Sequence, residues 1–232
     1  MKQIITLIFL LLFVAIKAQA QIPVPPESGV NNDTKADEKK TEAHKTQLNT
    51  SAYLVIGGGL AIPVGNFAAT SGENDGFAQT GIHGYAEAAY PIQHTNFGVA
   101  ARIDGYMNNI STNKVAVSDF GSSAHFYTRA ISAGFFATLP VNNNLSLDFK
   151  LLGGILVQSV SASGESKKNS EGAFEYNTSV NARYAFAKHF CGLITIGLLH
   201  TDPNYHYDRF VLGHGNIPTT LLNTSIGVGY QL

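Results

Sequence analysis

The chain has 232 residues, and charged residues make up 13% of it, roughly half the share that is usual in soluble domains. The formal net charge is −1, which is too small to favour nucleic acid as a partner. Cys191 is the single cysteine, so the sequence excludes an internal disulfide bond.

The N-terminus has the pattern of a secretory signal peptide. Lys2 supplies a positive start, residues 4–16 are almost entirely apolar, and Ala18 and Ala20 form a small-x-small cleavage site before Gln21. The apolar run of about 13 residues is shorter than the ~20 residues that a membrane-spanning helix needs. We therefore expect the first twenty residues, 1–20, to be a signal peptide that is cleaved during export.

Residues 21–51 differ in composition from the rest of the chain. They contain three prolines, nine charged residues and no aromatic residue. A segment of this kind cannot bury enough apolar surface to offset the entropy lost on ordering. We expect it to be a disordered polar tail in the periplasm.

From residue 52 onward, apolar and polar residues alternate with a period of two, which is typical of strands with two different faces. Most of the alternating segments are longer than the ~5–6 residues common in soluble proteins. They suit tilted transmembrane strands of about 9–11 residues with some overhang. The sequence predicts eight strands, near 52–63, 80–91, 97–108, 125–139, 145–160, 174–187, 190–201 and 219–232.

The connections between these segments alternate in length. The short ones are 93–96, 140–144 and 188–189, and the long ones are 64–79, 109–124, 161–173 and 202–218. Short turns at one end and long loops at the other are typical of outer-membrane barrels. The pattern predicts an all-β fold for 52–232: an eight-stranded antiparallel transmembrane up-and-down β-barrel with short periplasmic turns and long outer loops.

Charged residues in the middle of the strands fall on one parity, which we assign to the barrel interior. An outward Arg or Lys at mid-depth would cost roughly 2–4 kcal/mol. An eight-stranded barrel is just wide enough for its side chains to fill, so we expect a polar network without a wide open pore. The predicted network consists of Glu87, Arg102, Asp104, Asp148, Lys150 and Arg183. With a tight turn at 93–96, Glu87 faces Arg102 across the hairpin.

The opposite parity is apolar and is assigned to lipid. Arg129 breaks this rule, since it shares the parity of Ile131; it lies near the loop end, where the penalty falls toward ~0–1 kcal/mol. Cys191 has inward parity and is expected to be a small core residue. Outward aromatic residues predict one interfacial girdle near the periplasmic ends and a second near the loops. The first contains Tyr90, Phe97, Phe149, Tyr184, Phe186, Phe190 and Tyr230, and the second Phe126, Phe174 and Tyr176.

The last strand resembles the terminal signal by which the outer-membrane assembly machinery recognises its clients. Ser225, Gly227, Tyr230 and Leu232 match that pattern in place, although the pattern prefers Phe at the end. Residues 52–232, including the Ile-Pro-Val-Gly-Asn-Phe run after the first strand, resemble the outer-membrane protein β-barrel domain family. The resemblance implies the fold, a location in the outer membrane of a Gram-negative bacterium, and as partners membrane lipid and the assembly machinery. It implies no single activity.

Histidines and carboxylates gather near the last long loop, where they could bind a divalent metal or act as a base and its orienting group. The weak candidates are His200, Asp202, His206 and Asp208, with His214 nearby. A solvated polar loop explains the same residues, and their spacing matches no known motif. We expect no enzyme activity, no resident metal and no cofactor.

Three functions remain compatible with the sequence. The first is an outer-membrane barrel with a structural or surface-interaction role. The second is an exported soluble β-barrel or sandwich, whose apolar face points inward and binds a small apolar ligand. The third is an outer-membrane hydrolase or metal site in the 200–214 loop.

Overall fold

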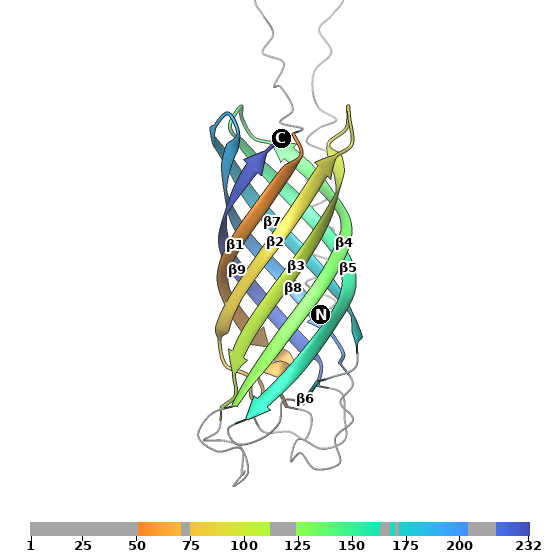
Figure 1. Ribbon diagram of the computed structural model, residues 1–232, viewed down its shortest axis with the longest axis vertical. Coiled ribbons are helices and arrows are strands. Elements are labelled where there is room, and N and C mark those ends of the chain that lie inside the picture. Colours follow the sequence, from red (N-terminus) through yellow and green to blue (C-terminus); the bar gives the residue numbers. More distant parts are fainter. Residues whose placement is uncertain (1–50, 71–74, 112–123, 163–167, 170–171, 204–216) are drawn as a thin grey trace, which may run out of the picture. The chain divides into compact units, whose positions relative to one another are not determined.

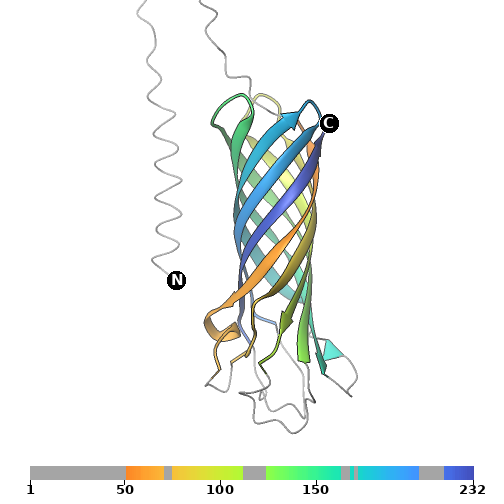
Figure 2. The same ribbon diagram turned by 90° about the vertical axis from the view of Figure 1, so that its left-hand side faces the viewer.

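The computed structural model describes residues 51–70, 75–111, 124–162, 168–169, 172–203 and 217–232. Eight long antiparallel strands form a closed barrel with inclined strands (Figures 1 and 2). Their bounds are β1 Tyr53–Val64, β2 Gly81–Pro91, β3 Phe97–Asn109, β4 Ala124–Pro140, β5 Leu145–Ala162, β7 Ala173–Ala187, β8 Phe190–Thr201 and β9 Thr219–Gln231.

Each long strand pairs with its neighbours in sequence. The ring closes because β1 pairs with β9 as well as with β2. β4 and β5 likewise form a hairpin that completes the other side. Two small elements lie beside the ring: the two-residue strand β6, Lys168–Asn169, pairs with β5, and the 3-10 helix η1, Gly65–Phe67, follows β1. The predicted eight-stranded barrel is confirmed, while β6 and η1 are additions to the prediction.

The two ends of the barrel differ. The connections 92–96, 141–144 and 188–189 lie at the same end as the C-terminus, which we name the short-turn end (Figure 2). The other end, which carries η1, is named the loop end. Within the described residues, no helix is long and apolar enough to cross a membrane.

Burial alternates along the strands with the predicted parity. In β3, side chains alternate between exposed and buried from Phe97 to Asp104 and beyond. The exposed set is apolar: Ile56 and Ile226 are each 71% exposed. The buried set contains the charged residues and also Cys191. This is the reverse of a water-soluble barrel, whose exterior is polar, so the alternative of an inward apolar face is wrong.

One residue of the predicted aromatic girdles lies on the opposite face. Phe126 is fully buried, whereas Phe174 and Tyr176 are exposed as predicted. The reason is parity: Phe126 shares the inward face of β4 with Thr128 and Ala130.

Glycines allow one aromatic side chain to lie flat across the barrel wall. Gly57 of β1 and Gly227 of β9 are direct partners. A Cβ atom on Gly57 would lie 2.4 Å from the Tyr85 ring, and one on Gly227 would lie 2.8 Å from the Tyr85 hydroxyl. Gly57 belongs to the Gly57-Gly58-Gly59 run, and this close approach gives it a packing role.

Candidate functional site

The lumen is the first candidate site, because it holds the charged residues that the sequence placed inside. All six residues of the predicted network are at most 4% exposed. Glu87 and Arg102 are direct partners across the β2–β3 hairpin, with 3.7 Å between Glu87 Oε2 and Arg102 Nη1. Arg102 Nε donates to Asp104 Oδ1 at 2.8 Å, and its guanidinium lies over the Tyr85 ring. Arg102 therefore joins two carboxylates of the same wall.

Lys150 links opposite walls of the barrel. It extends from β5 and donates to Glu87 Oε1 on β2. The two residues are 63 positions apart in sequence and lie on strands that do not pair. This ion pair therefore crosses the lumen.

A second ionic group surrounds Asp148, nearer the short-turn end. Arg183 Nε donates to its Oδ2 atom at 3.0 Å. The hydroxyl groups of Tyr53 and Thr138 donate to the same carboxylate at 3.0 and 2.7 Å. The four residues come from β5, β7, β1 and β4, so this carboxylate joins three neighbouring strands to β1 across the lumen.

Apart from tyrosines, two buried titratable residues of this region, His83 and Glu175, were not in the predicted network. His83 Nε2 lies 2.8 Å from Asp104 Oδ1, and its ring stacks on Tyr106 at 4.5 Å between centroids. Glu175 is fully buried, and neither of its carboxylate oxygens has a hydrogen-bond partner within 3.5 Å among the described residues. Ser132, Asp104 and Arg102 lie close enough to act on its charge. The position of both residues on the inward parity of their strands was the sequence signal that could have added them to the predicted network.

The loop end of the lumen is filled by an apolar cluster rather than by charges. Phe67 of η1 is fully buried and packs on Phe126, with 5.0 Å between ring centroids. The turn is held by a hydrogen bond from Ala78 N to Phe67 O at 2.9 Å. A Cβ atom on Gly76 would lie 2.7 Å from the Phe67 ring, so the glycine makes room for it. We name this the Phe67 cluster; it also contains Ala61, Ala78, Tyr106, Ile110, Ala124, Ala130, Leu156, Val160, Leu199, Ile217 and Leu221.

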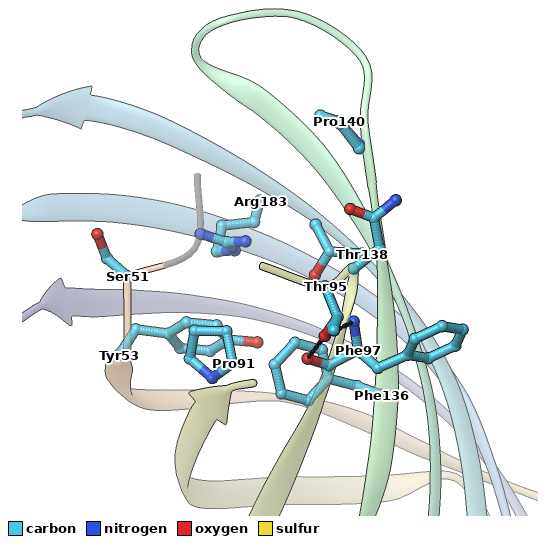
Figure 3. A pocket seen from close by; sticks show the side chains of 10 residues that line it. Ser51, Tyr53, Pro91, Thr95, Phe97, Phe136, Thr138, Pro140 and Arg183 are labelled. Carbon is cyan, nitrogen blue, oxygen red and sulfur yellow. Dashed lines mark hydrogen bonds between the residues drawn. The ribbon is translucent and has the colours of Figure 1, made fainter. Parts of the chain in front are cut away.

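A small pocket opens at the short-turn end. Tyr53, Phe136, Thr138 and Arg183 line it (Figure 3). Its free volume is about 10 Å³, close to the minimum that holds one water molecule. The pocket is therefore too small to be a solute entrance.

The histidine and carboxylate candidates are only partly described. His200 Nε2 lies 3.7 Å from Asp202 Oδ2, and His200 Nδ1 lies 2.7 Å from the Thr220 hydroxyl. His206, Asp208 and His214 lie outside the described residues. In the part of the chain that the structure describes, no three His, Cys, Asp or Glu side chains form a group that could hold a metal.

The residues of the predicted assembly signal lie on both faces of β9. Ser225 is buried in the lumen, and Tyr230 and Leu232 are 44% and 69% exposed. Gly227 packs against Tyr85. The cleavage residues Ala18, Ala20 and Gln21 lie outside the described residues.

The chain matches no family model and no curated protein. Solved structures do match it. Neisserial surface protein A (NspA) is 13% identical, covers 78% of this chain and 97% of its own, and superposes with a TM-score of 0.53. The Ail protein of Yersinia pestis is 12% identical over 79% of this chain and 99% of its own, with a TM-score of 0.45. The likeness to NspA shows a shared fold: this chain folds as a small eight-stranded barrel of the outer-membrane type.

Proposed function

We propose that the protein is an integral outer-membrane β-barrel of a Gram-negative bacterium, with a lumen closed to solutes and a structural or surface-interaction role. One observation carries this proposal: an apolar exterior surrounds an ion-paired interior. Large apolar side chains such as Ile56, Phe135 and Ile155 are each more than 60% exposed. In water, such a continuous patch would far exceed the few hundred Å² that a monomer usually exposes. In a lipid bilayer, the same surface would contact hydrocarbon and would not need to be buried by another protein.

Two features support a closed lumen. The Phe67 cluster fills the loop end, and the ionic groups around Glu87 and Asp148 cross the middle and the short-turn end. Side chains that pair with one another across the lumen leave little space for a solute. The proposed role therefore depends on surfaces and connections outside the lumen, and it is not catalytic.

The route to the membrane is part of the proposal. The leader 1–20 would direct export, and the terminal signal on β9 would be read by the assembly machinery. The tail 21–51 would remain in the periplasm, since it precedes β1 at the short-turn end. The four long connections would then face the outside, where they could contact a surface partner.

Cell fractionation and conductance test this proposal. The full chain, expressed in a Gram-negative host, should stay in the membrane pellet after carbonate extraction. Its gel mobility should also change on heating, as expected for a barrel that resists detergent when unheated. In a planar bilayer the purified barrel should show no stable open channel, with an open porin as positive control. Release by carbonate would refute the membrane assignment, and a stable conductance would refute the closed lumen.

The two other functions have less support. A carrier of an apolar ligand needs an apolar cavity, whereas the middle of this lumen contains ion pairs such as Lys150 with Glu87. A metal or hydrolase site at 200–214 is supported by His200 and Asp202 alone among the described residues. Replacing His200 and His206 with Ala and measuring zinc affinity tests it, and an unchanged affinity would end that hypothesis.

A further inference from the structure

Among the described residues, the outer wall of the barrel carries one charged side chain in an otherwise uncharged surface. Along the outward faces of the eight long strands, as far as the structure describes them, Arg129 of β4 is the only Arg, Lys, Asp or Glu. Its side chain is exposed, and no ion pair joins it to a described carboxylate. A cation in this position requires an anionic partner or water, because unpaired charge is costly at the edge of a hydrocarbon layer.

The depth of Arg129 places it near the loop-side edge of the apolar band. Ala137, eight residues further along β4, pairs with Phe97 of the aromatic girdle at the short-turn end. Eight residues of a strand tilted by about 40° rise roughly 20 Å along the barrel axis. The apolar band of such a barrel is about 25 Å tall. Arg129 therefore lies within reach of the level where lipid headgroups begin.

A groove leads from Arg129 toward the middle of this band. Its floor is formed by small residues, among them Ala133 of β4 and its direct partner Gly153 of β5. Ile103, Ile131 and Ile155 also line it; they are direct neighbours across β3, β4 and β5 and form a row between Arg129 and Ala133. Each of the three side chains is 59–66% exposed. The groove thus has a cation on one side of the isoleucine row and small residues on the other side, nearer the middle of the apolar band.

The space beside Arg129 is open. Its direct partner on β3 is Gly105, and a Cβ atom on Gly105 would meet no atom within 4 Å. The guanidinium therefore has room for a ligand at its side. Guanidinium groups bind phosphate through paired, charge-assisted hydrogen bonds.

We propose that this groove binds one phosphate-bearing lipid of the leaflet on the loop side, with the phosphate on Arg129 and an acyl chain along Ala133 and Gly153. The inference rests on the proposed membrane location. Charge complementarity favours a lipid over a second copy of the chain, because the same outward wall, in its described residues, offers no carboxylate to pair with Arg129.

Native mass spectrometry of the full chain in neutral maltoside micelles, doped with phosphatidylglycerol, tests the proposal. The wild type should retain one lipid preferentially, and R129Q should weaken its retention by about tenfold or more. A133L should also weaken it, since the leucine occupies the floor while the charge remains. K188Q is the matched control, because it removes one cation from the turn between β7 and β8 and should retain the lipid as the wild type does.

Each other outcome contradicts the proposal in a defined way. Equal retention by R129Q and wild type, or equal loss in K188Q, would overturn the site. Displacement by inorganic phosphate at the lipid concentration would show that an acyl chain is not needed. Dimers in place of a lipid-bound monomer would assign the groove to a second copy. Heat-modifiable mobility of every variant separates these results from failure of the membrane assignment: a barrel that inserts but retains no lipid refutes this inference alone.

Discussion

The Arg183 guanidinium donates to the Asp148 carboxylate inside the barrel, with 3.0 Å between Nε and Oδ2. Arg183 is 1% exposed and Asp148 is fully buried. Burying two charges is costly, so the pair is not itself a large source of stability. Removing only one of the two residues should nevertheless be strongly destabilising, because the other charge would stay buried without a counter-charge.

Asp148→Ala should lower the free energy of unfolding by about 3–5 kcal/mol, since Arg183 would stay buried without a partner. The double variant Asp148→Ala/Arg183→Met should recover part of that loss, because no charge is left unpaired. Urea unfolding in lipid vesicles measures both. Additive effects of the two changes would contradict a coupled pair.

Glu175→Gln should leave stability unchanged or raise it. The wild-type carboxylate is fully buried without a hydrogen bond within 3.5 Å among the described residues, and a neutral amide costs less to bury than a charged group. Glu87→Gln is the matched control and should destabilise, because Glu87 contacts both Lys150 and Arg102. Equal urea midpoints for the two variants would disprove the distinction.

Gly227→Ala should impair refolding of the purified protein in the absence of any assembly machinery. The added methyl group would approach the Tyr85 hydroxyl and the Ile56 carbonyl oxygen, at 2.8 and 3.0 Å, so a loss of about 1–3 kcal/mol is expected. Tyr85→Ala should remove much of this penalty, which a double-mutant cycle measures. A defect confined to cells would instead assign Gly227 to the assembly signal alone.

Phe67→Ala should destabilise the barrel by about 3–5 kcal/mol, the usual cost of truncating a buried Phe. Asn66→Ala is the control in the same turn, since Asn66 is exposed. Urea midpoints compare the two variants. If both behave like the wild type, the aromatic contact at the loop end contributes nothing to folding.

Ile226→Arg should cost about 2–4 kcal/mol when the protein is folded into a bilayer, because Ile226 is 71% exposed halfway along β9 and faces hydrocarbon. Ser161→Arg, at the loop end of β5, should cost only ~0–1 kcal/mol. Folding yields in vesicles at increasing urea give both values. Equal tolerance of the two arginines would argue for water around the middle of the barrel.

The sequence was sufficient for the strands and for their two faces. Predicted and observed bounds agree at 190–201 and differ by one or two residues elsewhere, because the period of two persists wherever the two faces of a strand differ in polarity. The pairing of Glu87 with Arg102 could also be predicted, since a tight turn fixes the register of a hairpin.

Contacts between strands that are distant in sequence could not be predicted in the same way. The alternation along each strand predicts that Lys150 and Glu175 point inward. It does not predict which residues of the opposite wall each of them contacts. That depends on the stagger of the strands around the barrel. Phe67 was missed for a different reason: a long polar connection gives no periodic signal, although part of it folds back into the barrel.

The position of Phe67 has a consequence for engineering. Surface loops of small barrels are attractive hosts for foreign epitopes, because loops usually tolerate insertion. Here the segment 65–70 supplies Phe67, which packs in the apolar cluster at the loop end of the lumen. The segment is held by the backbone hydrogen bond from Ala78 N to Phe67 O. An inserted epitope that replaced this segment would remove Phe67 from the buried cluster at the loop end. A vaccine or biosensor scaffold built on this protein should therefore keep the segment intact.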